Sequence, residues 1–240
     1  SPPNWFLNPF NGKVLSNQKS HWTELPDFHP DFGDIKHVWE ASRFEWVVTL
    51  ARAYAVSGNA IYIDTLNQWL GDWAAKNPVN TGPNWKCGQE AGIRVFNLIQ
   101  AALILGQWDA PRPALSEFID RHLERISANI RYAIAQDNNH GTSEAAALFI
   151  GGNWLSKTNT SFPRKRESSE TNQWKRYDHF AHLGRKWLEN RVEKLVEKDG
   201  SFSQHSVTYH RVLLDTLIFA EHWREKLGAA PFSATFYDRA

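Results

Sequence analysis

The residues with the clearest potential for chemistry stand together in the segment 137-DNNHGTSEAAALFIGG-152. Two amides, an imidazole, two hydroxyls and a carboxylate come directly before a run of small and apolar residues. Asn or Thr at a helix start accepts hydrogen bonds from free backbone N–H groups, and one such residue, for example Thr142, is enough for a cap. Two interpretations therefore stay open at this point: a capped, polar helix N-terminus, or a row of catalytic groups that includes Asn139, His140 and, one turn further on, Glu144.

A second polar segment, 199-DGSFSQHSVTYHRVLLD-215, places Tyr209 and His210 side by side at the start of an apolar helix. Taken alone, Tyr209 would be an aromatic residue at a rim with its hydroxyl in water. A phenol and an imidazole can both carry protons in acid–base catalysis. If these residues act together, Tyr209 and His140 must face each other across one cleft.

Two further clusters combine acidic and basic residues with aromatic ones, in 39-WEASRFEW-46 and 84-NWKCGQEAGIRVFN-97. Glu40 and Arg43 are one helical turn apart, and Glu90 and Arg94 are at positions i and i+4. Such pairs contribute a few tenths of a kcal/mol on an exposed helix (roughly 0.2–0.5). Since aromatic and apolar neighbours indicate burial, two interpretations stay open: an internal structural pair, or an Arg that binds an acidic ligand with two parallel hydrogen bonds. Arg94 is the better candidate for the second.

Helical periodicity covers most of the chain, and no segment shows the strict alternation of a half-buried strand. The expected helices span about 35–57, 61–75, 88–105, 113–135, 142 onward, 177–197 and 206–226. Short turns between them imply antiparallel hairpins. The fold class is therefore all-α, arranged either as a bundle or as a ring of hairpins around a central bore, and periodicity alone does not choose between them.

The expected organisation is an irregular arm over residues 1–33 followed by one helical domain over 34–240. A polar, charged run at about 156–175 interrupts the helical pattern. We interpret this run as a solvated insertion, because its composition does not bury a core, with a basic patch for an anionic polymer as the alternative. Part of it also resembles translated repeat elements of some bacterial genomes.

Composition limits the classes of function. With 27 basic and 26 acidic residues the chain gives no reason to expect nucleic acid, and no apolar run is long enough to span a membrane. The single cysteine excludes an internal disulfide, and the first residues given show no signal-peptide pattern. The absence of methionine suggests a processed chain or a sequence from which methionines were omitted. Twelve Trp and fourteen Phe supply flat amphipathic surface suited to carbohydrate rings.

Four stretches, taken in order, closely resemble the heparinase II/III-like family, most of all its bacterial members found among polysaccharide-assembly genes. They are WEASRFEW, NPxxxGxNWxxxxExxIR from Asn77 to Arg94, NNHGTSEAAALFIGG and DGSFSQHSVTYHR. The resemblance implies an incomplete (α/α) toroid, which favours the ring over the bundle. It also implies a polysaccharide lyase that cleaves a uronate-containing glycan by β-elimination, in the periplasm or outside the cell.

Carried onto this sequence, the resemblance implies that Asn139 or His140 neutralises the substrate carboxylate and that Tyr209 is the catalytic base, acid or both. Glu144 and Arg211 are second candidates that would orient His140 and Tyr209. Residues expected to bind the sugar are Trp85, Arg94, Glu90, Trp39 and Arg43. No cofactor and no metal are expected.

The resemblance also implies a C-terminal β-sandwich domain that supplies a further histidine, and residues 1–240 contain no strand-rich region. We therefore expect this chain to be the toroid part of a longer protein and to turn over little by itself. The acidic polysaccharide is the expected partner. Two other functions remain open: a glycan-binding or polysaccharide-assembly protein without turnover, and a glycoside hydrolase, which would need two carboxylates across the scissile bond.

Overall fold

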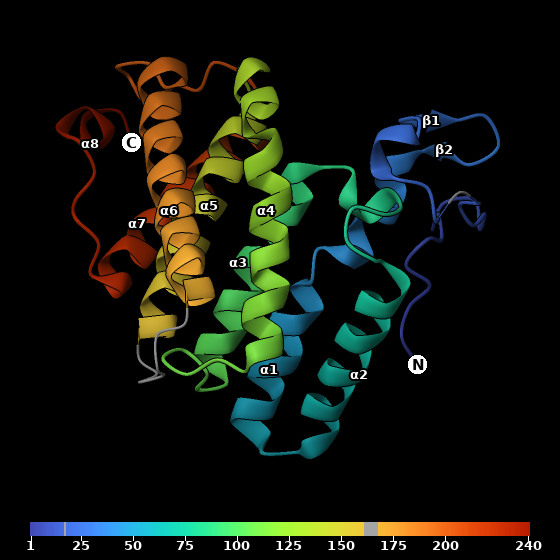
Figure 1. Cartoon of the computed structure of the whole chain (residues 1–240). Coiled ribbons are helices and arrows are strands. Elements are labelled where there is room, and N and C mark those ends of the chain that lie inside the picture. Colours follow the sequence, from blue (N-terminus) through green and yellow to red (C-terminus); the bar gives the residue numbers. More distant parts are fainter. Residues whose placement is uncertain (17, 161–167) are drawn as a thin grey trace. The chain divides into compact units, whose positions relative to one another are not determined.

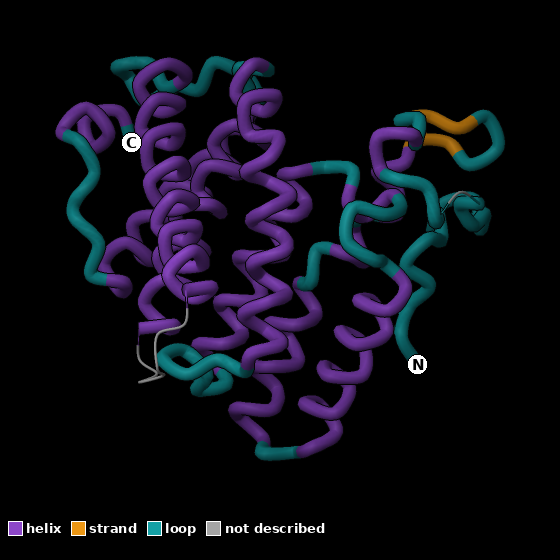
Figure 2. The backbone as a smooth tube through the Cα atoms, in the orientation of Figure 1, coloured by secondary structure: helices purple, strands orange, loops and turns teal. Residues whose placement is uncertain are grey.

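The computed structural model describes the backbone of residues 1–16, 18–160 and 168–240, and the side chains of residues 1–16, 18–158 and 174–240. Helices make up most of the described chain (Figure 1), and the only strands in these ranges are two residues long (Figure 2). The expected all-α class is confirmed. Backbone contacts divide the chain into two compact units, Ser1–Gln107 and Trp108–Ala240. No described helix is long and apolar enough to cross a membrane.

The first unit begins with irregular chain and ends with three α-helices. Its elements are η1 (Trp22–Glu24), β1 (Phe28–His29), β2 (Gly33–Asp34), η2 (Ile35–Val38), η3 (Glu40–Ser42), α1 (Glu45–Ser57), α2 (Ala60–Lys76), η4 (Pro83–Trp85) and α3 (Gly88–Ile104). The strands β1 and β2 pair antiparallel. Helix α1 packs against both α2 and α3. A left-handed Gly58 ends α1, and the side chain of the next residue, Asn59, caps α2, so α1 and α2 form a hairpin.

The helix expected from Ile35 begins only at Glu45. The preceding residue, Phe44, has a left-handed backbone conformation (φ 68°, ψ 22°), which interrupts a right-handed helix. Residues 35–42 form two short 3-10 helices instead. A 3-10 helix repeats every three residues, so its buried side chains show nearly the same spacing in the sequence as those of an α-helix.

In the second unit, three other helices pack around one central helix, α5. Its elements are α4 (Pro113–Ala135), α5 (Asn139–Thr160), α6 (Ser168–Leu195), α7 (Val207–Leu227) and α8 (Ala234–Arg239). Helix α5 packs against α4, α6 and α7. Its stretch of residues 145–150 is buried on every side, in agreement with its apolar sequence. This packing fixes the N-terminal turn of α5, which carries Asn139 and His140.

The polar run at about 156–175 lies partly outside the described residues. Where the backbone is described, residues 156–160 belong to α5 and residues 168–175 belong to α6. Residues 161–167 and the side chains of 159–173 are outside the described part of the chain.

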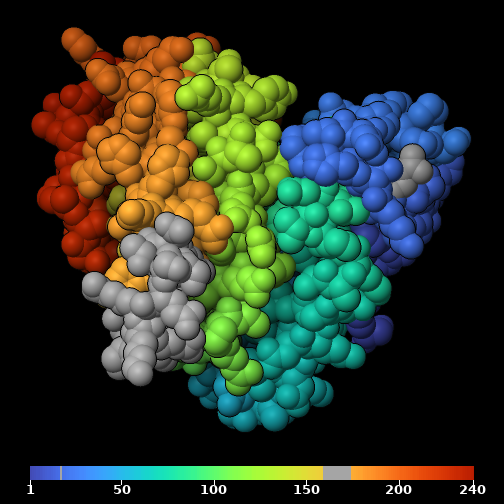
Figure 3. Space-filling model, viewed as in Figure 1, coloured from blue at the N-terminus to red at the C-terminus, as the bar shows by residue number. Residues whose placement is uncertain are grey.

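Helices α4 and α6 lie side by side in the second unit (Figure 3) and are joined by an ionic cluster. The Arg176 guanidinium binds the carboxylates of Asp120 and Glu124. Oδ1 of Asp120 is buried and has no hydrogen-bond partner in the described chain. Burial raises the pKa of Asp120 from its ordinary 3.8 to about 6, because desolvation of the carboxylate outweighs the attraction of Arg176.

Replacing Asp120 with Asn should change how stability depends on pH. Because the carboxyl pKa is higher in the folded than in the unfolded chain, its contribution is fully present below about pH 4 and is lost as the pH rises through about 6. The difference corresponds to at most about 3 kcal/mol. The free energy of unfolding of the wild type relative to Asp120→Asn, measured in urea, should therefore increase as the pH falls from about 7 to about 4. Asp109→Asn, at an exposed position, should show the same dependence of the free energy of unfolding on pH as the wild type. The prediction would be contradicted if Asp120→Asn and the wild type also showed the same dependence.

Candidate active site

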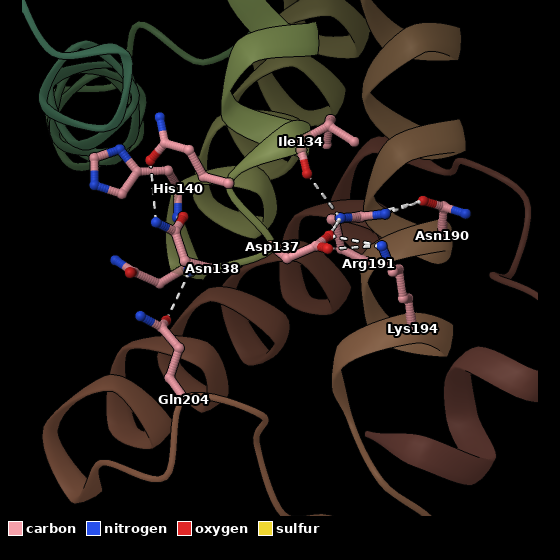
Figure 4. A network of polar contacts seen from close by, with 10 residues as sticks. Ile134, Asp137, Asn138, His140, Asn190, Arg191, Lys194 and Gln204 are labelled. Carbon is pink, nitrogen blue, oxygen red and sulfur yellow. Dashed lines mark hydrogen bonds and ion pairs between the residues drawn. The ribbon is translucent and has the colours of Figure 1, made fainter.

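The turn between α4 and α5 carries the polar motif, and Figure 4 shows its contacts. The first N–H groups of an α-helix have no acceptor within the helix. Oδ1 of Asn138 accepts from the backbone N–H of His140 at 2.9 Å, and Oε1 of Gln204 accepts from the N–H of Asn139 at 2.8 Å. Inside the helix, the hydroxyl of Thr142 donates to the carbonyl of Asn139. An Asn therefore caps α5, as the sequence predicts, and this Asn is Asn138.

Asp137 and Arg191 hold this turn in place from the side of α6. Asp137 has a left-handed backbone conformation (φ 47°), and its carboxylate accepts from Lys194 and Arg191. These two hydrogen bonds, that of Lys194 first, lower the pKa of Asp137. Arg191 also donates to the carbonyl of Ile134 at the end of α4. Its side chain passes close to Gly141, where a Cβ would lie 3.0 Å from Arg191 Cδ and 3.4 Å from the carbonyl oxygen of Ala133, so a larger residue there would require Arg191 to shift.

His140 is half-buried and faces a buried carboxylate. Its Nδ1 lies 3.8 Å from Oε1 of Glu144, with 30% of the imidazole side chain exposed and 4% of the Glu144 side chain. Burial raises the pKa of Glu144, while the imidazole of His140 and the charge of Arg125 oppose that rise. Glu144 thus lies beside the imidazole that the resemblance expects it to orient.

The carboxamide of Asn139 stands out because it is nearly buried and unpaired. The residue is 4% exposed, and its backbone groups bond Gln204, Thr142 and Ser143. Its side-chain amide makes no hydrogen bond within the described part of the chain. The amide atoms are not among the fully buried polar atoms without a partner, so they reach solvent through the small exposed part of the residue. An unpaired amide beside a half-exposed imidazole is a group available to a ligand.

Tyr209 lies in the first turn of α7, whose N-terminal cap is Ser206. The residue is 43% exposed, and its hydroxyl has no partner in the described part of the chain. Arg211, two residues later, is exposed. The hydrogen bond from Asn139 to Gln204 joins the segment that leads into α7 to the start of α5. The structure therefore connects the two polar segments, 65 residues apart, through the backbone N–H of Asn139 and the side chain of Gln204.

In the first unit, the expected pair of Glu40 and Arg43 forms, whereas Glu90 also pairs with Arg43 and not with Arg94. Nε and Nη2 of Arg43 donate to the two carboxylate oxygens of Glu90 at 2.9 and 3.0 Å. Its third nitrogen, Nη1, donates to Glu40 at 2.6 Å. The bidentate hydrogen bonds to buried Glu90 raise the pKa of Arg43 above its ordinary range. Arg43 is half-buried and its guanidinium is engaged by two protein carboxylates.

Arg94, Trp85 and Trp39 belong to the interior of the first unit. Arg94 lies within 5.1–6.0 Å of the ring centroids of Phe44, Trp73 and Trp85, and donates to the carbonyl of Asn84 at 2.7 Å. Arg94 and Trp85 are fully buried, and Trp39 is nearly so. Arg94, Trp85 and Trp39 were expected to bind sugar, but in this structure their side chains expose almost no surface to which a sugar could bind. The guanidinium of Arg94 is a cation enclosed by the aromatic rings of Phe44, Trp73 and Trp85.

A groove of about 820 Å³ lies elsewhere in the first unit, between the N-terminal arm and the end of α2. It is lined by Asn4, Phe6, Val14, Gln18, Lys19, Ala75, Lys76, Pro78 and Thr81. None of the residues that the sequence singles out is among them.

Three residues of the site in the second unit are missing from the sequence-based prediction: Gln204, Asp137 and Arg191. Gln204 and Asp137 lie inside the two polar segments, so their closeness in sequence to the candidate catalytic residues could have identified them as site residues. Arg191 stands in a regular helical pattern on α6, and no local feature distinguishes it from a surface arginine. Its burial is visible only in the folded chain.

In the described part of the chain, no group of three or more His, Cys, Asp or Glu side chains could hold a metal ion. Comparison with known proteins gives one finding. The family model described as Heparinase II/III N-terminus matches residues 4–237. No curated protein and no solved structure matches the chain.

Proposed function

Because this chain belongs to the heparinase II/III family, whose N-terminal domain is an α/α toroid, we propose that it is the helical domain of a polysaccharide lyase. The substrate class is an acidic, uronate-containing glycan, and the reaction is β-elimination. The observation that carries the proposal is the Asn139 carboxamide, which is nearly buried, unpaired in the described chain and next to His140.

The chemistry requires a group of this kind. The proton on C5 of a uronate leaves only if the adjacent carboxylate is neutralised and the enolate-like anion is stabilised. The N–H of the Asn139 amide would donate to that carboxylate. The phenolate of Tyr209 would take the C5 proton, and the electron pair left behind would form the C4=C5 double bond while the C4–O bond breaks. The resulting Tyr209 hydroxyl can return its proton to the leaving oxygen, so the step balances without another reagent.

His140 has a supporting role in this proposal. An imidazole held by the Glu144 carboxylate supplies a second hydrogen-bond donor or a positive charge beside the substrate carboxylate. Arg211 is exposed in the first turns of α7 and could contribute charge to the binding of an anionic chain. Neither residue is required for the electron count of the elimination.

The two alternative functions differ in what they need. A glycoside hydrolase requires two free carboxylates across the scissile bond. Glu40 and Glu90 both bind Arg43, and Glu144 is buried beside His140, so none of the three is a free carboxylate. A glycan-binding protein without turnover would use the same amide and aromatic groups. Measurement of product therefore separates it from the lyase.

The test is to incubate the protein, produced from its whole gene, with alginate, hyaluronan and heparan sulfate. Formation of the C4=C5 bond is followed by its ultraviolet absorbance. We expect product with at least one polymer, and loss of product in Asn139→Leu. Because the amide has no protein partner in the described chain, Asn139→Leu should unfold at the same temperature as the wild type or higher.

Ser143→Ala is the control on the same turn, since it removes a hydroxyl that donates to the backbone carbonyl of Asn139 and leaves the Asn139 carboxamide in place. It should retain product formation. Absence of product from the wild type with every polymer would contradict the proposed reaction. A large loss of stability in Asn139→Leu would show that the amide has a structural role.

A further inference from the structure

Gln204 joins the two polar segments of the second unit. Its Oε1 accepts the backbone N–H of Asn139 at 2.8 Å, across 65 residues of sequence (Figure 4). This N–H is the first of α5 and has no acceptor in its own helix. Asn138 caps the N–H of His140, and the distant side chain of Gln204 caps the N–H of Asn139.

The loop that carries Gln204 is itself held in one conformation. Its preceding residue Ser203 donates its backbone N–H to the carbonyl of Leu195, and Phe202 is buried. The following residue, His205, has a left-handed conformation (φ 41°), which is unfavourable for a non-glycine residue. Such a conformation persists only where neighbouring contacts fix it. Ser206 then caps α7 through the N–H of Tyr209.

We propose that Gln204 is a positioning residue, which sets the placement of Tyr209 relative to Asn139 and His140 through the backbone of Asn139. This inference rests on the proposed elimination. Base and carboxylate-binding group must reach the same sugar ring at hydrogen-bond distance, and a displacement of about 1 Å can lower the rate about 100-fold. Between Gln204 and Tyr209 the chain is short, and between Gln204 and Asn139 there is one hydrogen bond. The contact therefore lies on the direct connection between the two groups.

Two substitutions of nearly equal length separate positioning from packing. Gln204→Glu retains an oxygen that accepts the Asn139 N–H, and a negative charge is favourable at a helix N-terminus. Gln204→Met keeps the length and removes the acceptor. We expect kcat to fall about 10- to 100-fold in Gln204→Met while KM changes less than about threefold, and kcat to stay near the wild-type value in Gln204→Glu. Repulsion of an acidic glycan by the new carboxylate would appear in KM.

Gln136→Met is the matched control. Gln136 lies in the same turn, but its side chain accepts only an exposed hydrogen bond from Asn138. Its kcat should equal that of the wild type. A second readout does not depend on turnover. Hydrogen exchange of the backbone N–H of Asn139, followed by NMR, should be fast in Gln204→Met and slow in the wild type and in Gln204→Glu.

The outcomes distinguish the two proposals. If the wild type forms product and Gln204→Met has the same kcat, the positioning role is wrong. It is also wrong if the backbone N–H of Asn139 exchanges equally slowly in Gln204→Met and in the wild type. If the wild type forms no product with any polymer, the proposed elimination itself is wrong, whatever the exchange of Asn139 shows.

Discussion

Replacing Tyr209 with Phe should lower formation of the unsaturated product by about 10²- to 10⁴-fold, the usual contribution of a general acid or base. The phenol is the only proton carrier that the proposed step needs from this chain. Its hydroxyl makes no hydrogen bond in the described chain, and the residue is 43% exposed. The thermal unfolding midpoint of Tyr209→Phe should therefore match that of the wild type. Initial rates from ultraviolet absorbance, with melting curves on the same samples, measure both quantities.

Tyr132→Phe is the matched control, since Tyr132 is 73% exposed on α4. It should leave both the rate and the unfolding midpoint unchanged. An unchanged rate in Tyr209→Phe would remove this residue from the mechanism. If the wild type binds an acidic glycan without forming product and Tyr209→Phe binds equally well, the chain is a glycan-binding protein.

Replacing Gly184 with Ala should destabilise the second unit by about 2–3 kcal/mol or more. A Cβ at Gly184 would collide with the backbone of α5, at the nitrogen of Phe149 and at 2.6 Å from the carbonyl oxygen of Ala145. These are backbone atoms of a helix buried among three others, so relief requires α5 and α6 to separate. Gly152 on α5 makes the reciprocal approach to α6, 2.8 Å from the carbonyl of Tyr177. For a chain of this size the unfolding midpoint should fall by about 5–10 °C.

Gly71→Ala is the same type of substitution, but it should raise the free energy of unfolding, which Gly184→Ala should lower. Gly71 is an exposed residue inside α2, and a Cβ there meets nothing within 4 Å. Because alanine favours a helix over glycine by about 1 kcal/mol, Gly71→Ala should stabilise the protein. Equal effects of the two substitutions on the free energy of unfolding would show that the close packing of α5 on α6 does not limit stability.

Local signals explain which helices were predicted well. Helix α4 begins at Pro113 and ends at Ala135, as expected, because proline is favoured in the first turn of a helix and an amphipathic pattern follows it. The fold class, an incomplete (α/α) toroid of antiparallel hairpins, is confirmed through the family. The start of α1 was misplaced by ten residues, since the left-handed conformation of Phe44 has no signature in its residue type.

The sequence by itself determined the helical class, the family and the two polar segments, because helix periodicity, capping and motif order are properties of neighbouring residues. Tertiary structure decided the partners. Glu90 binds Arg43, 47 residues away, and Arg94 is enclosed by aromatic rings instead of reaching solvent. The unpaired amide of Asn139 and its backbone link to Gln204 likewise arise only when α5 and α7 pack together. Spacing along one helix fixes which residues share a face, whereas burial and pairing depend on what that face meets.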